Sequence, residues 1–208
     1  MARELVLATR NRHKREELAG LLDGLDIRIH TMDEFPDVPE VIEDGETCEA
    51  NAIKKAHSIS KATGLWAVAD DTGLEVDALG GRPGVYAARY AGDHASYEDN
   101  WRKLLGQLTG VPRHRRTARF VTVAAVVSPG ETAQVATGYL DGLIAESPAG
   151  THGFGYDPVF FVPQVGKTLA EMSIVDKNRI SHRAKAFAQV RNLLQNRCCD
   201  QSGRSAAR

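Results

Sequence analysis

Strand and helix patterns alternate along most of this 208-residue sequence, and a hairpin pattern interrupts the alternation. Two strand-like segments, 119–127 and 131–139, flank Ser128-Pro129-Gly130, which is typical of a hairpin turn. Strands joined by a hairpin are antiparallel, whereas strands joined through a helix are usually parallel. The sequence therefore predicts an α/β fold with a mixed sheet and helices packed on it. Further strands are predicted at 5–8, 27–29, 66–69, 74–76 and 157–162, and helices at 12–23, 48–63, 97–108 and 182–196.

The composition is that of an ordinary globular protein and excludes two classes of partner. Hydrophobic residues make up 42% and charged residues 25% of the chain, and the net charge is −1. This balance lacks the basic footprint of a protein that binds nucleic acid or a membrane surface. No apolar run approaches the ~20 residues of a membrane span.

Cysteine usage and the chain ends indicate the compartment and the domain organisation. The three cysteines show neither a disulfide framework nor zinc spacing, and a strand pattern begins almost at once, in place of a signal peptide. We therefore expect a cytoplasmic protein. A single domain is predicted over 1–197, followed by a disordered polar tail over 198–208.

Asp70 and Asp71 are adjacent carboxylates at the end of the apolar run 66–69, directly before a predicted turn at Thr72-Gly73. Two like charges side by side repel, so folding alone gives little reason to place them after a core strand. Ligands of open α/β sheets gather beyond the carboxyl ends of strands, and Mg²⁺ prefers oxygen ligands. We expect one carboxylate to hold a metal ion while the other orients or deprotonates water. The alternative is a turn in which aspartate caps the following backbone N–H groups.

The segment Thr9-Arg-Asn11-Arg-His-Lys14 follows one strand and opens a helix, a position that suits phosphate binding. Thr9 and Asn11 offer hydrogen-bond donors, and Lys14 adds a positive charge. In the alternative interpretation, Asn11 only caps the helix and Lys14 lies on a solvated face.

A second lysine, Lys55, lies four residues after Asn51, so the two side chains share one face of the predicted helix 48–63. Glu43 lies upstream in an acidic loop. The alternative is a solvated lysine and a loop glutamate without a function. No cysteine lies near a motif and no serine has a Gly-x-Ser-x-Gly setting, so we expect no covalent nucleophile.

Two further segments are candidates for recognition of a flat ring. In Gly153-Phe-Gly-Tyr-Asp-Pro158 an aromatic ring lies between glycines, which suits stacking on a base, worth ~1–3 kcal/mol. The alternative is a bulged strand with Phe154 turned inward. After Ser181, a suitable N-cap, His182 and Arg183 place cations where the helix dipole opposes them by ~0.3–1 kcal/mol. A bound anionic or carbonyl-rich ligand would compensate; otherwise the two are solvated side chains.

Taken together, these motifs resemble the inosine triphosphate pyrophosphatase family, in the family's order and over residues 5–195. The matching pieces are Thr9-x-Asn11-x-x-Lys14, Glu43 with Asn51-Ala-Ile-x-Lys55, Ala69-Asp-Asp-Thr-Gly73 with Gly80-Gly-x-Pro-Gly84 and Ala88-Arg-Tyr90, Gly153-Phe-Gly-Tyr-Asp-Pro158, and Ser181-His-Arg183.

The resemblance implies an elongated mixed α/β fold of two lobes with a central cleft, usually as a homodimer. It implies Mg²⁺-dependent attack of water on the α-phosphate of ITP, dITP or XTP, which gives the monophosphate and pyrophosphate. Glu43 and Asp71 would hold the metal, and Asp71 would activate the water with support from Asp70. The residues implied at the triphosphate are Thr9, Asn11, Lys14 and the catalytic Lys55. Phe154 would stack on the base, and its edge would be contacted by Asp157, Lys177, His182 and Arg183. The remaining implied substrate-binding residues are Thr72 and Tyr156.

Arg10 departs from the family pattern, in which glycine is common after the first Thr or Ser. Its long, positively charged side chain either touches phosphate or points to solvent.

Two other functions fit the sequence less well. A phosphatase with Asp70 as covalent nucleophile would need an Asp-x-Asp pattern, whereas this chain has Asp-Asp-Thr. A nucleotide sensor without turnover is disfavoured because every carboxylate that the resemblance requires is present.

Overall fold

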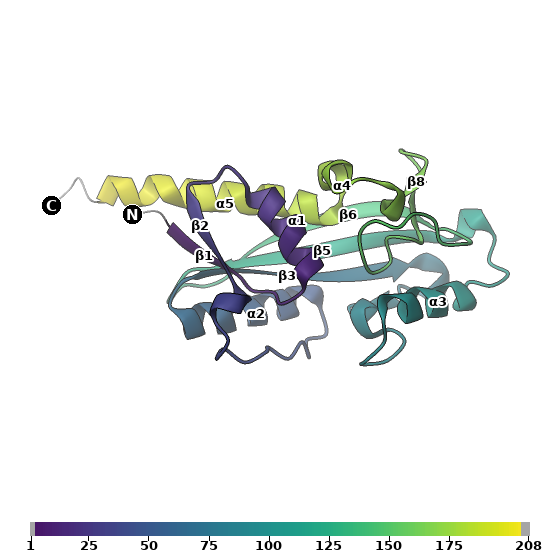
Figure 1. Ribbon diagram of the computed structural model, residues 1–208, viewed down its shortest axis with the longest axis horizontal. Coiled ribbons are helices and arrows are strands. Elements are labelled where there is room, and N and C mark those ends of the chain that lie inside the picture. Colours follow the sequence, from purple (N-terminus) through teal and green to yellow (C-terminus); the bar gives the residue numbers. More distant parts are fainter. Residues whose placement is uncertain (1–2, 205–208) are drawn as a thin grey trace. The chain divides into compact units, whose positions relative to one another are not determined.

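The computed structural model has one mixed β-sheet flanked by helices, as the sequence predicts (Figure 1). It describes the secondary structure of residues 3–204 and the side chains of residues 3–196. The strands are β1 (Arg3–Leu7), β2 (Ile27–Thr31), β3 (Trp66–Val76), β4 (Pro83–Gly84), β5 (Thr117–Val127), β6 (Gln134–Ile144), β7 (Phe160–Val162) and β8 (Lys167–Thr168). The α-helices are α1 (Arg12–Leu22), α2 (Cys48–Thr63), α3 (Tyr97–Gln107), α4 (Ile174–Ile180) and α5 (His182–Arg204).

The sheet is parallel on one side and antiparallel on the other. Its strand order is β2-β1-β3-β5-β6-β7-β8, and β4 pairs with β3 beside this path. β1 runs parallel to β2 and β3, whereas the pairs β3–β4, β6–β7 and β7–β8 are antiparallel. The parallel strands are those that helices connect, which follows from the length of chain that a parallel crossover needs.

Backbone contacts divide the chain into two compact units, each with its own hydrophobic core. Unit 1 comprises Met1–Asp71, Val123–Gly138 and Ala184–Arg208, and unit 2 comprises Thr72–Thr122 and Tyr139–Arg183. The boundaries fall within β3, β5 and β6 and near the start of α5, so these elements contribute residues to both units.

In unit 1, α1 and α5 pack on one face of the strands and α2 on the other (Figure 1). Leu18 and Leu22 of α1 are four residues apart, so they share one face of the helix and enter the same core as Phe187 of α5. On α2, Ala52 and Ala56 are completely buried.

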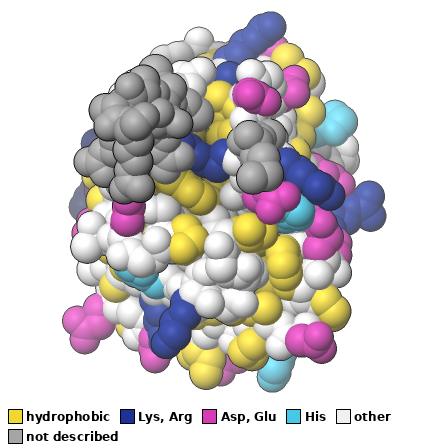
Figure 2. All heavy atoms as spheres, turned by 90° about the vertical axis from the view of Figure 1, so that its left-hand side faces the viewer, with side chains coloured by type: hydrophobic (Ala, Val, Ile, Leu, Met, Phe, Trp, Pro, Cys, Tyr) yellow, Lys and Arg dark blue, Asp and Glu magenta, His cyan; other side chains and the backbone are white. Residues whose placement is uncertain are grey.

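Figure 2 shows acidic and basic side chains interspersed with apolar and neutral ones, in keeping with the net charge of −1.

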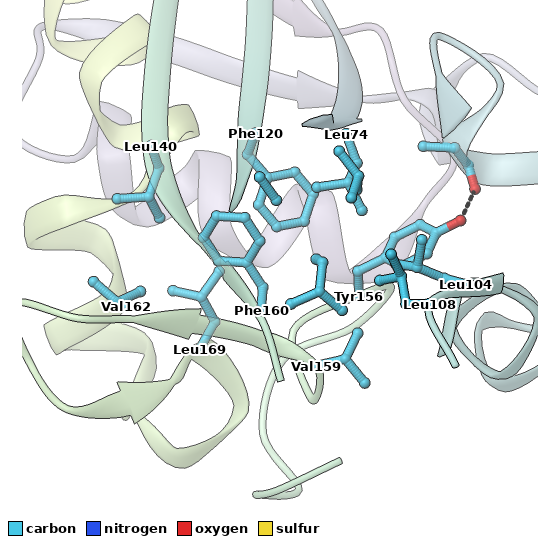
Figure 3. Packing of buried hydrophobic residues seen from close by; sticks show 14 of the residues in the cluster. Leu74, Leu104, Leu108, Phe120, Leu140, Tyr156, Val159, Phe160, Val162 and Leu169 are labelled. Carbon is cyan, nitrogen blue, oxygen red and sulfur yellow. Dashed lines mark hydrogen bonds between the residues drawn. The ribbon is translucent and has the colours of Figure 1, made fainter. Parts of the chain in front are cut away.

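The core of unit 2 is built around aromatic rings (Figure 3). The rings of Phe120 and Phe160 lie with centroids 4.5 Å apart. Tyr156 packs beside Leu104 of α3 and Leu108, the residue after this helix, and its hydroxyl donates a hydrogen bond of 2.9 Å to the Ala87 carbonyl. This hydrogen bond satisfies the polar end of an otherwise apolar side chain.

The prediction that β3 ends before Asp70 is wrong. The strand continues from Trp66 through the predicted turn at Thr72-Gly73 to Val76, so the two aspartates lie within it. Local propensity favours a turn at Asp-Asp-Thr-Gly, but tertiary partners satisfy these polar side chains inside the sheet. The Thr72 hydroxyl, for example, lies 2.7 Å from that of Thr122.

Other boundaries differ from the predictions at points where local signals are weak. The second hairpin strand is β6, Gln134–Ile144, which begins and ends later than predicted, and β7 begins at Phe160. The short helix α4 and the strand β8 are absent from the predictions. Helix α5 continues to Arg204, through the first part of the predicted disordered tail; the end of that tail, 205–208, lies outside the described residues. No helix among the residues described is long and apolar enough to cross a membrane.

Candidate active site

Asp70 and Asp71 alternate across β3, which resolves the repulsion expected of adjacent carboxylates. Successive side chains of a strand point to opposite faces of the sheet, so each aspartate has its own partner. Asp70 Oδ2 lies 3.2 Å from Lys14 Nζ of α1, and Asp71 Oδ2 accepts a hydrogen bond of 3.0 Å from Asn51 Nδ2 of α2. Both aspartates are buried, with 1% and 6% of their surface exposed.

Two lysines converge on the Asp70 position. Lys55 Nζ donates hydrogen bonds of 2.6 Å to the Asp70 carbonyl and 2.6 Å to Glu43 Oε1, so it joins the acidic loop to β3. Lys14 Nζ also donates to the Asp70 carbonyl, at 3.4 Å. Lys14 and Lys55 therefore do not lie on solvated faces, and Glu43 is a loop glutamate that is paired with Lys55.

Lys55 is a permanent cation in this setting. Its burial disfavours the charged form, but the negative charges of Asp70, Glu43 and Asp71 outweigh that effect, so its pKa is raised above the ordinary value. The Lys55 ammonium is thus within electrostatic reach of all three carboxylates. It stays protonated throughout the physiological range of pH.

The side chains of Asn11 and Thr9 accept hydrogen bonds from backbone N–H groups at the start of α1. Asn11 Oδ1 accepts a hydrogen bond of 3.2 Å from the Lys14 N–H, and Thr9 Oγ1 accepts one of 3.2 Å from the Asn11 N–H. The capping role that was the alternative for Asn11 is therefore real, and it fixes the loop whose helix end suits an anion. Arg10 does not reach this loop's interior; its guanidinium donates to the carbonyls of Met32 and Val38.

The donor chemistry of this group fits Mg²⁺ bound together with a substrate. Among residues 3–196, no three His, Cys, Asp or Glu side chains are arranged to hold a metal ion by themselves. Mg²⁺ commonly takes one or two carboxylates and completes its shell with water and substrate phosphates. Two lysines and three carboxylates leave one net negative charge, which would repel a polyanion unless a cation accompanied it.

A second group of predicted residues lies in unit 2, around Phe154. Asp157 Oδ2 accepts a hydrogen bond of 2.9 Å from the Phe154 N–H and lies 2.5 Å from Lys177 Nζ. Both partners of this ion pair are buried, with side-chain exposures of 4%. Gly153 has a φ of +74°, and a Cβ atom there would collide with Asp157 Oδ2. The loop conformation that presents Phe154 is therefore set by Asp157 and by the absence of a side chain at 153.

The ring of Phe154 is flanked by cations and by another aromatic ring. Lys177 Nζ lies 5.0 Å and Arg183 Cζ 5.5 Å from its centroid. The ring of Tyr97, at the start of α3, lies 5.8 Å away and is tilted by 46°. This arrangement presents an aromatic face beside hydrogen-bond donors, the chemistry that suits a base with carbonyl oxygens.

His182 and Arg183 are buried at the start of α5, so the solvated alternative is wrong for both. The His182 ring stacks on Phe120, with centroids 4.4 Å apart and planes at 17°. Arg183 is 1% exposed, and its Nη2 donates a hydrogen bond of 3.2 Å to the Thr72 hydroxyl. Thr72 thus anchors the guanidinium that lies beside Phe154.

The structure also departs from the predicted site. Tyr156, predicted to bind substrate, lies in the hydrophobic core, and its hydroxyl donates a hydrogen bond to the Ala87 carbonyl.

The expectation that no cysteine lies near a motif is wrong. Burial raises the pKa of the Cys48 thiol to about 12, and the charge of Asp71 and a hydrogen bond to it act in the same direction. The position of Cys48 three residues before Asn51, on the same helix face, was the signal available in the sequence.

Known proteins match this chain over nearly its whole length. Residues 5–193 match the Ham1 family. The dITP/XTP pyrophosphatase of Geobacter sulfurreducens is 52% identical over 190 residues, which cover 91% of this chain and 96% of that protein. The dITP/XTP pyrophosphatase of Bacillus subtilis is 43% identical over 193 residues, 93% of this chain and 98% of that protein. The structure of a HAM1 protein from Coxiella burnetii superposes with a TM-score of 0.85 at 40% identity, covering 93% of this chain and 99% of that one.

Proposed function

The chain belongs to the Ham1 family, and on this premise we propose that it is a pyrophosphatase of dITP, ITP and XTP. The reaction gives the nucleoside monophosphate and inorganic pyrophosphate, and so removes non-standard purine nucleotides from the precursor pool. One observation carries the proposal: Lys55 links Glu43 to the Asp70 carbonyl, which gathers the carboxylates and cations of phosphate chemistry at one strand. A phospho-aspartate mechanism has no comparable support, because that class needs an Asp-x-Asp pattern and this chain has Asp-Asp-Thr.

We propose that the triphosphate binds at the unit 1 group. The helix end at Thr9 and Asn11 offers an anion its dipole, and the ammonium groups of Lys14 and Lys55 neutralise phosphoryl charge. Phosphoryl transfer depends mainly on positioning and charge stabilisation, so these groups suffice without a covalent nucleophile. Asp71 is assigned to orient the attacking water and to accept its proton, while Asp70 holds Lys14 in place.

Glu43 and Asp71 would hold Mg²⁺ in this proposal, together with oxygens of the substrate. When bound, the ion would polarise the phosphoryl oxygens and lower the pKa of a coordinated water. The net negative charge of the unit 1 group supports this assignment, because a polyanionic substrate needs a cation to bind beside three carboxylates. Lys55 keeps Glu43 directed toward β3 before the substrate arrives.

The base is assigned to the unit 2 group. Phe154 would stack on the purine, and Lys177, His182 and Arg183 would supply donors to its edge. Hypoxanthine and xanthine carry an oxygen at position 6, whereas adenine carries an amino group that would face those donors. A buried unpaired polar group costs ~1–3 kcal/mol, so adenine is rejected. Asp157 acts in this scheme through Lys177 and the Phe154 N–H.

We also expect a homodimer, which the family resemblance implies, and a cytoplasmic location, which the cysteine usage favours. Sedimentation equilibrium of the purified protein tests the first expectation. A monomer at micromolar concentration would contradict it.

The decisive experiment is a substrate panel with separate detection of pyrophosphate and orthophosphate. Purified protein is incubated with dITP, ITP, XTP, GTP or ATP, with Mg²⁺ and with a chelator. We expect pyrophosphate from the first three only, and only with the metal. Guanine shares the oxygen at position 6, so rejection of GTP must come from its 2-amino group. Asp71→Asn should lower turnover by at least about 100-fold while the protein still folds, which a cooperative urea transition checks. Release of orthophosphate alone, or turnover that survives the chelator, would refute the proposal.

A further inference from the structure

We propose that Asn51 is a positioning residue that joins the Glu43 loop to Asp71, so that the two carboxylates assigned to the metal are held as one unit. The inference rests on the proposed function, to which it adds one residue and a structural link between Glu43 and Asp71. Asn51 is 1% exposed on α2, one turn before Lys55. Its amide is already engaged by Gly45 and Asp71, so its effect passes through these neighbours.

Both ends of the Asn51 amide are engaged. Its Nδ2 donates to Asp71 Oδ2 at 3.0 Å, and its Oδ1 accepts from the Gly45 N–H at 2.8 Å. The partners fix the orientation of the amide, since a carboxylate can only accept and a backbone N–H can only donate. Gly45 lies two residues after Glu43, so this one side chain ties the acidic loop to the strand that carries Asp71.

The glycine at position 45 is required by this contact. A Cβ atom there would lie 2.7 Å from Asn51 Oδ1 and 3.0 Å from the Ala50 side chain. The first of these distances is shorter than real Cβ contacts, so any larger residue must push the amide or the loop aside. The loop can approach α2 closely enough for the Gly45–Asn51 hydrogen bond only because residue 45 has no side chain.

Lys55 makes the second tie between the same loop and strand, from Glu43 Oε1 to the Asp70 carbonyl. The two ties lie one helical turn apart on α2 and fix the loop at both 43 and 45. Groups that orient metal-binding carboxylates typically contribute about 10- to 100-fold to metal affinity or activity. Asn51 has the geometry for such a contribution.

The test uses two variants that break the bridge from its two sides. Asn51→Leu removes both the donor to Asp71 and the acceptor for the Gly45 N–H, and it adds no charge beside the proposed metal ligands. Gly45→Ala leaves Asn51 intact and displaces the loop. Asn100→Leu is the matched control, because Asn100 is also a buried helical amide, which accepts from the Ala91 N–H at 2.7 Å and donates to the Ala88 carbonyl at 3.1 Å within unit 2.

The main readout is the affinity for Mn²⁺, which electron paramagnetic resonance measures. The titrations contain a dITP analogue in which a methylene group bridges the α- and β-phosphates, so that it cannot be hydrolysed there. We expect Asn51→Leu and Gly45→Ala each to weaken Mn²⁺ binding by about 10- to 100-fold, with the Asn100→Leu affinity unchanged. In turnover assays the same two variants should lower kcat and raise the Mg²⁺ concentration for half-activation, with KM for dITP unchanged at saturating Mg²⁺. Hydrogen exchange at the Gly45 amide should accelerate in Asn51→Leu.

Wild-type Mn²⁺ affinity in a folded Asn51→Leu protein would overturn the inference, and so would equal losses in Asn51→Leu and Asn100→Leu. If Asn51→Leu does not fold, Gly45→Ala decides by the same criterion. The proposed function fails separately, when the wild-type protein releases no pyrophosphate; the Mn²⁺ titrations and the Gly45 exchange still decide the role of Asn51.

Discussion

Lys55 Nζ lies 2.6 Å from the carbonyl oxygen of Asp70, a buried main-chain contact between α2 and the middle of β3. The same ammonium group lies 2.6 Å from Glu43 Oε1. Asp71 follows Asp70 directly. The side chain of Lys55 therefore holds both the strand backbone beside Asp71 and the loop that carries Glu43. The first prediction follows from this double contact.

Lys55→Met should lower both stability and turnover. Removal of one partner from a buried ionic group costs about 3–5 kcal/mol, because the carboxylates are left without their counter-charge. Loss of a charge-stabilising donor lowers kcat by about 100- to 1,000-fold. Urea unfolding and pyrophosphate release measure the two effects. The neighbouring Lys54 is the control, since it pairs with Asp44 at the surface and Lys54→Met should change neither quantity measurably. Equal effects of the two substitutions would contradict the prediction.

Phe154→Leu should weaken substrate binding more than it slows the chemical step. Stacking of a base on an aromatic ring contributes ~1–3 kcal/mol, which corresponds to a rise in KM for dITP of about 5- to 150-fold. Steady-state kinetics on dITP measure this, and Phe161→Leu supplies the comparison. Phe161 lies on β7 with the Arg113 guanidinium 4.7 Å from its ring centroid, so it also has a cation–π partner. If KM stays at the wild-type value in Phe154→Leu, the base does not stack there.

The Asp157–Lys177 pair should show strong energetic coupling. Asp157→Asn or Lys177→Met alone leaves an uncompensated buried charge and should cost about 3–5 kcal/mol of unfolding free energy. The double variant should cost less than the sum of the two, because it leaves no charge unpaired. Chemical denaturation of the four proteins measures the coupling. The exposed pair Arg119–Asp141, at 2.7 Å, should show little coupling in the same cycle. Additive effects at Asp157 and Lys177 would show that the pair is not formed in solution.

Cys48 should make the protein less stable at alkaline pH. The pKa of its thiol is raised from the ordinary 9.0 to about 12 in the folded protein, so between these values only the unfolded chain releases the proton. Unfolding is then favoured as the pH rises, and the stabilisation present below pH 9 is lost progressively. The wild type should lose about 1 kcal/mol relative to Cys48→Ala between pH 9 and 10. Denaturation curves of the two proteins at both pH values measure this difference, and parallel pH dependences would contradict the assignment.

The sequence by itself determined features that depend on neighbouring residues. The start of α2 follows from Thr47, whose hydroxyl accepts from the Ala50 N–H at 3.1 Å, and its end follows from Gly64 with a φ of +70°. Both are local interactions that a short segment makes on its own. The mixed sheet was likewise predictable, because hairpin and helix connections impose opposite strand directions. The residues gathered around Asp70 and Phe154 were named from their motifs, although the motifs did not reveal their contacts.

Only the tertiary structure decided how those residues are held. β3 continues through Asp70-Asp71-Thr72-Gly73 because partners distant in sequence satisfy its polar side chains, whereas the local sequence favours a turn. The bridge from Asn51 to Asp71 spans 20 positions and the pair Lys177–Asp157 also spans 20. Hydrogen bonds and ion pairs over such separations depend on how the elements pack, and no pattern of neighbouring residues encodes them. The roles of Asn51 and Asp157 in fixing the loops beside them therefore emerged only from the folded chain.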